Sequence, residues 1–161
     1  MDGNNRWSKK KNLSLFESYK SGANKLLQLS NYLFFEKDIN NISAFALSTN
    51  NLKRPKRILK EINKVINHSL NRLSKKNDNN FRIRFIGDLK VFDKNTTLKI
   101  KNIEKINNNK KKILNIYLNF GGQEEIVNII NFFRKSNSKI TIKKIHNEYF
   151  QKYNFEPDIL I

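Results

Sequence analysis

Short apolar runs of strand length alternate along this chain with longer segments in which apolar residues recur at helical spacing. Clear examples of the runs are "NISAFAL" (41–47), "FRIRFIG" (81–87) and "KILNIYLNFGG" (112–122), and another strand-like run is "PDILI" (157–161). Runs of this length are typical of buried or half-buried strands. Strands that alternate with helices predict an α/β domain in which a mostly parallel central sheet is flanked by helices.

The segments around these strands have the periodicity of amphipathic helices. Their predicted ranges are 20–37, about 55–73, 94–108, about 122–133 and 141–154. In the second of them, Pro55 stands where a first helical turn tolerates proline. One face of that helix collects Ile58, Ile62, Val65, Ile66, Ser69, Leu70 and Leu73. The sequence contains no internal repeat and no linker, so we expect residues 1–161 to form one domain.

Composition limits the classes of protein to which the chain can belong. Lys and Arg number 32 against 14 Asp and Glu, a net charge of +18, which on its face predicts a polyanionic partner. Lys, Asn and Ile crowd the whole chain, as expected of an AT-rich genome, so much of the charge is interpreted as solvated surface. The sequence has no cysteine, which excludes thiolate zinc sites and cysteine nucleophiles, and no apolar run of bilayer-spanning length. We expect a cytoplasmic protein with at most peripheral membrane contact.

The loops that follow the predicted strands are the candidate site, because ligands of open α/β folds bind beyond the carboxyl ends of parallel strands. These loops are "STNNLKRP" (48–55), "GDLK" (87–90) and "NFGGQ" (119–123). Each is polar and contains glycine or amide side chains. The opening "DGNNRW" (2–7) has the same character and also leads toward a helix.

Taken in order, "MDGNNRW", "ALSTNNLKRP", "RIRFIGD", "LNIYLNFGGQEEIV" and "PDILI" resemble the motif series of the cis-prenyltransferases, the undecaprenyl diphosphate synthase family. The resemblance extends over essentially the whole chain, and it implies the cis-prenyltransferase fold. It also implies an isoprenyl transferase that condenses isopentenyl diphosphate with an allylic diphosphate such as farnesyl diphosphate. That reaction loses diphosphate and a proton and forms a cis-polyprenyl diphosphate, a lipid carrier precursor. The family implies a homodimer, or here a partner chain.

The resemblance assigns the opening segment to the allylic diphosphate. It implies that Asp2 is a catalytic carboxylate that binds Mg²⁺ and that Trp7 packs against the substrate. Four neighbouring residues would cradle the diphosphate: Gly3, Asn4, Asn5 and Arg6. These residue types suit that role, because cations, arginine and helix-terminal N–H groups stabilise a departing diphosphate, and Mg²⁺ favours carboxylate and phosphate oxygens. Alternatively, Asp2 is only an N-cap.

The second loop supplies further expected substrate contacts. By resemblance, Ser48 and Thr49 contact the substrate, Arg54 lies near the diphosphate, and Asn51 is a catalytic residue that helps to remove the proton. Asparagine is a poor base, so it is better suited to orient a diphosphate oxygen or a water that accepts the proton. The alternative is that residues 48–51 only cap the next helix, and both interpretations can hold together.

The chain also departs from the family pattern. Leu15, Ser18 and Tyr19 stand in place of a diphosphate-binding arginine, a glycine and a histidine, which removes two expected polar contacts. Other departures are Asn50, Leu52 and Gln123, in place of an acidic residue, a tryptophan and an arginine. The family further has a strand before the opening motif and, beyond "PDLLI", an arginine motif, a serine-bearing loop and a metal-binding glutamate. We therefore expect a partial domain, shortened at both ends, that binds an allylic diphosphate weakly and turns over slowly or not at all alone.

Two other functions stay open. The chain could be a non-catalytic or degenerate subunit or scaffold of a cis-prenyltransferase. A basic nucleic-acid-binding module is argued only from charge, and the sequence has neither an RNP-like aromatic strand nor a zinc pattern, so we expect no nucleic-acid partner.

Some residues of suggestive type are assigned to surface or core. His68 and His146 stand apart from carboxylates and are expected at the surface. The phenylalanines could line a tunnel for the isoprenoid tail, but aromatics at helical spacing usually form core. The residues concerned are Phe16, Phe34, Phe35, Phe132 and Phe133.

Overall fold

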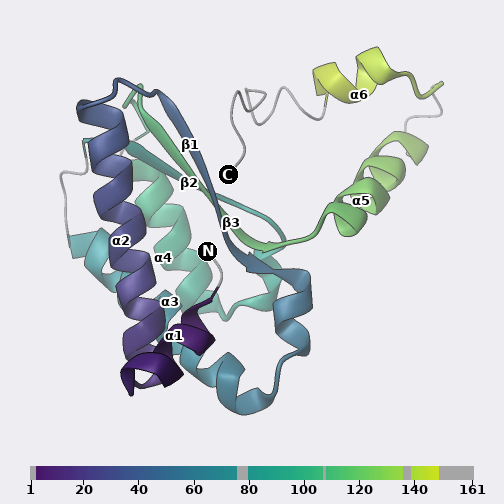
Figure 1. Ribbon diagram of the computed structural model, residues 1–161. Helices are drawn as coiled ribbons and strands as arrows, with labels where there is room; N and C mark the ends of the chain where they lie inside the picture. The colour runs from purple at the N-terminus through teal and green to yellow at the C-terminus, as the bar shows by residue number, and fades with distance from the viewer. Residues whose placement is uncertain (1–2, 76–79, 107, 136–138, 149–161) are drawn as a thin grey trace. The chain divides into compact units, whose positions relative to one another are not determined.

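The computed structural model describes residues 3–75, 80–106, 108–135 and 139–148 (Figure 1). The chain separates into two compact units, Met1–Phe120 and Gly121–Ile161. The first unit holds the sheet and the loop 48–55, and the described part of the opening segment also belongs to it. The expectation of one domain over residues 1–161 stays a prediction.

The first unit is built on a three-stranded sheet of β1 (Asn41–Ser48), β2 (Arg82–Ile86) and β3 (Ile113–Phe120), in the order β1-β3-β2. Both pairings are parallel. The predicted α/β fold with a parallel sheet and flanking helices is therefore confirmed. Since the strands run in one direction, the loops at their carboxyl ends lie at the same edge of the sheet. The predicted strand "PDILI" falls outside the described residues.

Three helices cover one face of this sheet: α2 (Leu15–Phe35), α3 (Lys56–Lys75) and α4 (Lys94–Ile106) (Figure 1). Their apolar sides share one buried cluster with the strands, in which Phe34 of α2, Leu70 of α3 and Ile100 of α4 meet Leu114 of β3. This cluster explains the helical spacing of the sequence, because a helix or strand with one apolar face must bury it against another element.

The beginning of α2 lies earlier than the apolar pattern predicts. Ser14 is its N-cap: the Ser14 side chain accepts from the Glu17 backbone N–H, and the Ser14 backbone N–H donates to Glu17 Oε2 at 3.0 Å. Such a capping box fixes where a helix begins, and here it places the start of α2 at Leu15, ahead of the predicted start at residue 20. A separate short helix, α1 (Asn4–Lys11), precedes it and ends at Asn12, which has a left-handed φ of 52°.

Two short 3₁₀ helices follow strands of the first unit: η1 (Thr49–Lys53) after β1 and η2 (Leu89–Val91) after β2. The second unit contains α5 (Gly122–Arg134) and α6 (Ile142–Glu148). The predicted helix 141–154 is thus confirmed over α6, and its remainder lies outside the described residues. Within the described ranges, none of the helices combines the length and apolar character needed to cross a bilayer.

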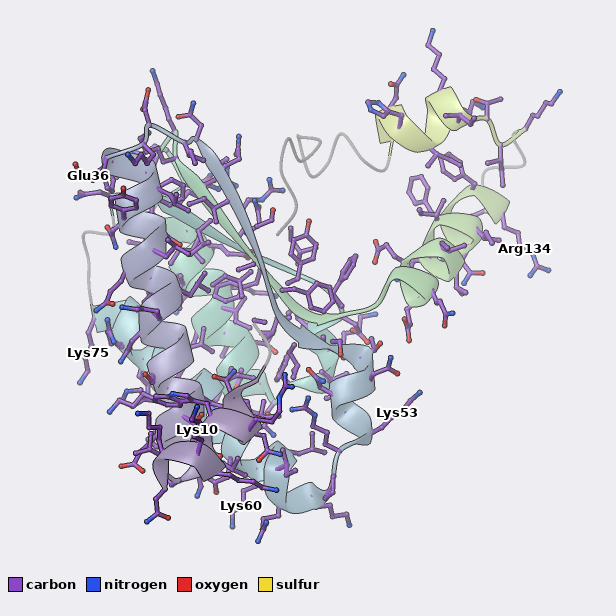
Figure 2. All side chains as sticks on the ribbon, viewed as in Figure 1. Lys10, Glu36, Lys53, Lys60, Lys75 and Arg134 are labelled. Carbon is purple, nitrogen blue, oxygen red and sulfur yellow. The ribbon has the colours of Figure 1, made fainter. Side chains whose placement is uncertain are left out.

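Lysines project from the helical surfaces of the first unit, as Lys10, Lys53, Lys60 and Lys75 illustrate (Figure 2). All of them are exposed. Their positions agree with the interpretation of much of the net charge as solvated surface.

Candidate functional site

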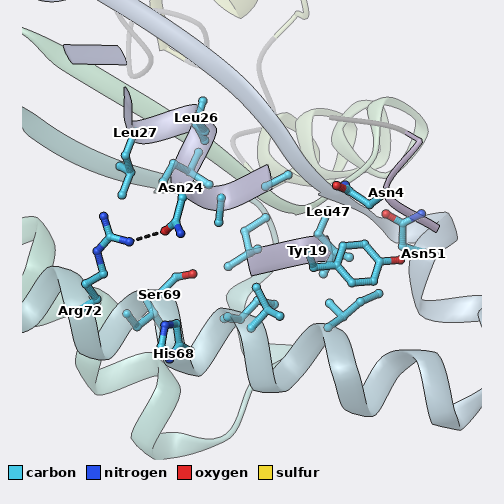
Figure 3. Close-up of a pocket in the computed structure, with 18 of the residues that line it drawn as sticks. Asn4, Tyr19, Asn24, Leu26, Leu27, Leu47, Asn51, His68, Ser69 and Arg72 are labelled. Atoms are coloured by element: carbon cyan, nitrogen blue, oxygen red, sulfur yellow. Dashed lines mark hydrogen bonds between the residues drawn. The ribbon is translucent and has the colours of Figure 1, made fainter. Parts of the chain in front are cut away.

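A pocket of about 370 Å³ lies in the first unit, where α1, α2, α3 and η1 meet the sheet (Figure 3). Its two ends are polar. At one end, here called the head end, the lining residues are Gly3, Asn4, Asn5, Arg6, Tyr19, Asn51 and Arg54. At the other, the far end, they are Asn24, His68, Ser69 and Arg72. The lining also contains apolar side chains, among them Ile62, Val65 and Ile116. In Figure 3 Leu47 lies between the two ends, and Leu26 and Leu27 lie beside Asn24 at the far end.

The first turn of α1 contributes backbone N–H groups to the head end. Trp7 N donates to Gly3 O at 2.8 Å, the first backbone hydrogen bond of this helix. The N–H groups of Asn4, Asn5 and Arg6 therefore precede any intrahelical acceptor. Gly3 is the N-cap, with a left-handed φ of 81° that glycine adopts without strain, and it has no side chain of its own to cap the helix. A helix start of this kind favours a bound anion.

The loop after β1 brings Asn51 and Arg54 to the same end. Ser48 N donates to Asn51 Oδ1 at 3.1 Å, and Arg54 N donates to Asn51 O at 3.2 Å, so both ends of η1 are fixed through Asn51. Arg54 Nη1 in turn donates to Tyr19 Oη at 3.0 Å. Because Asn51 Oδ1 accepts the Ser48 N–H, the side-chain amide nitrogen remains as a donor. Such a donor suits a phosphate oxygen better than it suits proton removal.

The electrostatics of the pocket favour an anionic ligand. Arg6 and Arg54 line the head end, Arg72 lines the far end, and no carboxylate is among the lining residues in the described part of the chain. Carboxyl groups with a shifted pKa lie elsewhere. A hydrogen bond from Lys112 lowers the pKa of Asp38, and hydrogen bonds from Thr96 lower the pKa of Asp93.

The structure brings most of the predicted site residues together. The head end gathers residues from both predicted segments, namely Gly3, Asn4, Asn5, Arg6, Asn51 and Arg54. Trp7, Ser48 and Thr49 adjoin it in sequence without lining the pocket. Asp2 lies outside the described residues. The loops "GDLK" and "NFGGQ" contribute no lining residue, although they follow strands of the same sheet.

Sequence reasoning missed the far end and Tyr19. Tyr19 counted as a lost contact because a histidine was expected at its position. His68 was expected at the surface, but it is half-buried and lines the pocket. The available signal was spacing, since Arg72 follows Ser69 by three residues and Val65 by seven and so shares the apolar face of α3.

None of the five phenylalanines considered for a tunnel is among the residues that line this pocket, although Phe85 is. Phe34 is fully buried in the core of the first unit, and Phe16 and Phe35 are absent from the lining. In the second unit, Phe133 is buried and Phe132 is half-exposed. Core packing is therefore confirmed for Phe34 and Phe133.

Comparison with known proteins identifies the family of the chain. The prenyltransferase family model described as undecaprenyl diphosphate synthase matches residues 1–161. The chain belongs to the undecaprenyl diphosphate synthase family. The resemblance read from the sequence is thereby confirmed.

Individual members of this family resemble the chain along most of its length. The tritrans,polycis-undecaprenyl-diphosphate synthase (geranylgeranyl-diphosphate specific) of Pyrobaculum aerophilum is 31% identical, over 99% of this chain and 71% of that protein. The ditrans,polycis-undecaprenyl-diphosphate synthase ((2E,6E)-farnesyl-diphosphate specific) of Micrococcus luteus is 29% identical, over 100% of this chain and 68% of that protein.

A crystal structure supports the same assignment. A probable undecaprenyl diphosphate synthase from Campylobacter jejuni matches with a TM-score of 0.66 at 28% identity, over 73% of this chain and 58% of that one. The chain thus spans 58 to 71% of the length of these undecaprenyl diphosphate synthases.

Proposed function

We propose that the pocket binds an allylic diphosphate and that the chain acts as an isoprenyl transferase. The observation that carries this proposal is the distribution of polarity along the pocket. A head end with two arginines and several amides continues into an apolar section. An allylic diphosphate has the same polarity, a strongly anionic head on a hydrocarbon tail, and a pocket recognises a ligand through a few placed polar groups on an apolar wall.

In the proposed reaction the bond between the allylic carbon and its diphosphate breaks, and a carbon–carbon bond forms to isopentenyl diphosphate. A proton leaves the added unit as its new cis double bond forms. The N–H groups of the first turn of α1, with Arg6 and Arg54, stabilise the negative charge that grows on the departing diphosphate. The amide nitrogen of Asn51 holds one of its oxygens.

The remaining predicted residues keep roles beside the pocket. Trp7, which is 39% exposed, packs against the substrate. Ser48 and Thr49, at the start of η1, contact substrate outside the lining. These roles rest on the motifs alone.

We also propose Mg²⁺ as the cofactor, with Asp2 as its protein ligand. Asp2 immediately precedes Gly3, which lines the head end. The described residues contain no cluster of three or more His, Cys, Asp or Glu side chains that could hold a metal. A single carboxylate with phosphate oxygens and water is nevertheless a donor set that Mg²⁺ accepts. When bound, the ion neutralises part of the diphosphate charge.

Titration of tryptophan fluorescence tests the binding. The chain has one tryptophan, Trp7, on the helix whose first turn forms part of the head end. We expect saturable, Mg²⁺-dependent binding of farnesyl or geranylgeranyl diphosphate, and binding of farnesol weaker by at least about tenfold. Equal binding of the alcohol would contradict the assigned head end. Salt-dependent retention on RNA without diphosphate binding would favour the nucleic-acid alternative.

Incorporation of labelled isopentenyl diphosphate separates the enzyme from the non-catalytic alternative. We expect the chain alone to extend the allylic diphosphate slowly or not at all, and to extend it faster with a partner chain. Specific binding with no incorporation, alone or with added partner chains, would favour a scaffold subunit. We propose a homodimer, or a complex with a partner chain, in the cytoplasm and with at most peripheral membrane contact. Sedimentation measures the oligomeric state, and vesicle flotation measures the membrane contact.

A further inference from the structure

Tyr19 and Arg54 form a contact at the head end that the motifs do not predict. Tyr19 lies near the start of α2, and Arg54 is the C-cap of η1, 35 positions away in sequence. Arg54 Nη1 donates to Tyr19 Oη at 3.0 Å. Both residues are half-buried and line the pocket beside Asn51. Figure 3 shows the Tyr19 ring next to Asn51 and Asn4.

The contact orients a cation without cancelling its charge. A guanidinium has five N–H donors and no acceptor, and the phenol that receives one of them is neutral. Among the described residues, no carboxylate pairs with Arg54. Lys112 is a contrasting case, because its Nζ lies 2.7 Å from the Asp38 carboxylate and its charge is compensated. The charge of Arg54 thus remains available to an anion in the pocket.

Holding an arginine in place before a ligand arrives lowers the cost of binding. A free arginine side chain loses rotamer freedom when a ligand orders it, and a side chain that is already ordered loses less. We propose that Tyr19 is a positioning residue, whose hydroxyl holds the Arg54 guanidinium toward the diphosphate head of the ligand. This inference rests on the proposed function. It assigns a role to a position that the motifs count as a lost histidine contact.

The ring and the hydroxyl of Tyr19 have separable roles. The ring packs against the hydrophobic core of the first unit, so it contributes to folding. Tyr19→Phe keeps the ring and removes only the hydroxyl. Tyr32→Phe is the matched control, because Tyr32 lies on the same helix, is 48% exposed and does not line the pocket. Thermal unfolding of both variants checks that the fold is retained.

A first experiment needs no ligand. The protein is treated with phenylglyoxal, which modifies accessible arginines, and the rate at Arg54 is followed by peptide mass spectrometry. Loss of one hydrogen bond predicts a rate about fivefold higher in Tyr19→Phe and unchanged in Tyr32→Phe. An unchanged rate in Tyr19→Phe would show that the hydroxyl does not hold Arg54, and would overturn the inference whatever the ligand.

A second experiment measures binding in a double-mutant cycle. Tyr19→Phe should weaken the binding of farnesyl diphosphate by about tenfold and leave the binding of farnesol unchanged, because only the diphosphate contacts Arg54. In an Arg54→Met background the same substitution should change the affinity less than about twofold, since Tyr19 acts through Arg54. If the fold-losses in affinity of the two single variants multiply in the double variant, Tyr19 does not act through Arg54 and the positioning role is wrong. If wild type binds no allylic diphosphate, the proposed function is wrong and this role falls with it; if wild type and Tyr19→Phe bind equally, only this inference is wrong.

Discussion

The hydroxyl of Ser18 donates a 2.6 Å hydrogen bond to the backbone carbonyl of Asn4. Ser18 is fully buried near the start of α2, and Asn4 is the first residue of α1. The bond therefore joins the beginnings of the two helices and fixes the first turn of α1 at the head end of the pocket. Ser18 stands where the motifs expect glycine, and a glycine has no hydroxyl with which to make this contact.

Replacing Ser18 by alanine should lower both stability and affinity. The substitution removes this hydrogen bond between α1 and α2, which is expected to lower the free energy of unfolding by about 1 kcal/mol. It should also weaken farnesyl diphosphate binding, because the first turn of α1 is no longer fixed. Urea denaturation and fluorescence titration measure the two effects.

Ser30 provides the matched control for this prediction. It is fully buried on the same helix, but its hydroxyl donates to Leu26 O, a carbonyl four residues earlier in α2. Ser30→Ala should cost less stability than Ser18→Ala and leave binding unchanged, because no contact with α1 is lost. Equal losses in both variants would mean that burial of a small polar side chain, and not the contact with Asn4, explains the effect.

Gly22→Ala should separate stability from binding. A Cβ at Gly22 would lie 2.9 Å from Asn4 Oδ1, so the Asn4 side chain must move away from α2. Alanine favours the helix interior by about 1 kcal/mol, which offsets the cost of that movement. We expect a melting temperature at least equal to that of wild type and weaker binding of farnesyl diphosphate. Gly122→Ala, where nothing lies within 4 Å of the added Cβ, should not alter binding; unchanged binding by Gly22→Ala would remove Asn4 from the site.

Much of the fold could be predicted from sequence because burial imposes a period on the residues. Leu114 and Leu118 share one face of β3 and meet Ile83 of β2 in the core, as the strand patterns indicate. The start of α2 could not be found this way, since a capping box of polar residues, Ser14 and Glu17, determines it. A period in apolar residues carries no information about such a cap.

The head end could be predicted because its residues lie in short contiguous motifs, as Asn4 and Arg54 do. The far end could not be predicted, because Arg72 is one of many basic residues. Only its position on the pocket-facing side of α3 distinguishes it from Arg57, which is exposed. Tyr19 was missed for another reason. From the sequence alone, tyrosine in place of the expected histidine means only that the histidine contact is lost. The structure shows that the tyrosine hydroxyl accepts a hydrogen bond from Arg54.

Gly87→Ala should prevent the sheet from forming correctly. Gly87 follows β2 with a φ of 135°, and a Cβ there would lie 2.2 Å from the backbone carbonyl oxygen of Leu118. The Leu118 carbonyl belongs to β3 and cannot move away without disturbing that strand. The backbone of residues 87–88 is also held in place, because Asp88 N donates to Asn119 O at 3.2 Å. We expect a loss of about 3 kcal/mol or more in the free energy of unfolding, measured by urea denaturation. A variant as stable as wild type would contradict this backbone geometry.

The capping box of α2 should make stability depend on acid pH. Hydrogen bonds from the Ser14 side chain and backbone lower the pKa of Glu17 below its ordinary value of 4.5. A carboxyl whose folded pKa is lowered adds stability that is present above its unfolded pKa and is lost as pH falls through the folded pKa. Wild type should therefore exceed Glu17→Gln in stability at neutral pH, and the difference should shrink below about pH 4.5. In a Ser14→Ala background the difference should be smaller, because only the backbone N–H at position 14 still donates to Glu17; a difference that persists in acid would argue against the carboxylate as its source.

Arg72 should limit the length of tail that the pocket accepts. It donates through Nη1 to Asn24 Oδ1, and this pair, with His68 and Ser69, makes the far end polar where a longer hydrocarbon tail would arrive (Figure 3). Arg72→Leu replaces the cation by an apolar side chain. Each further methylene of the ligand tail would then be buried against an apolar group, without the cost of desolvating a charge. The affinity for geranylgeranyl diphosphate relative to farnesyl diphosphate should rise by about tenfold in competition titrations. Arg57→Leu, an exposed position on the same helix that does not line the pocket, should leave this ratio unchanged, and an unchanged ratio in Arg72→Leu would mean that the tail does not reach the far end.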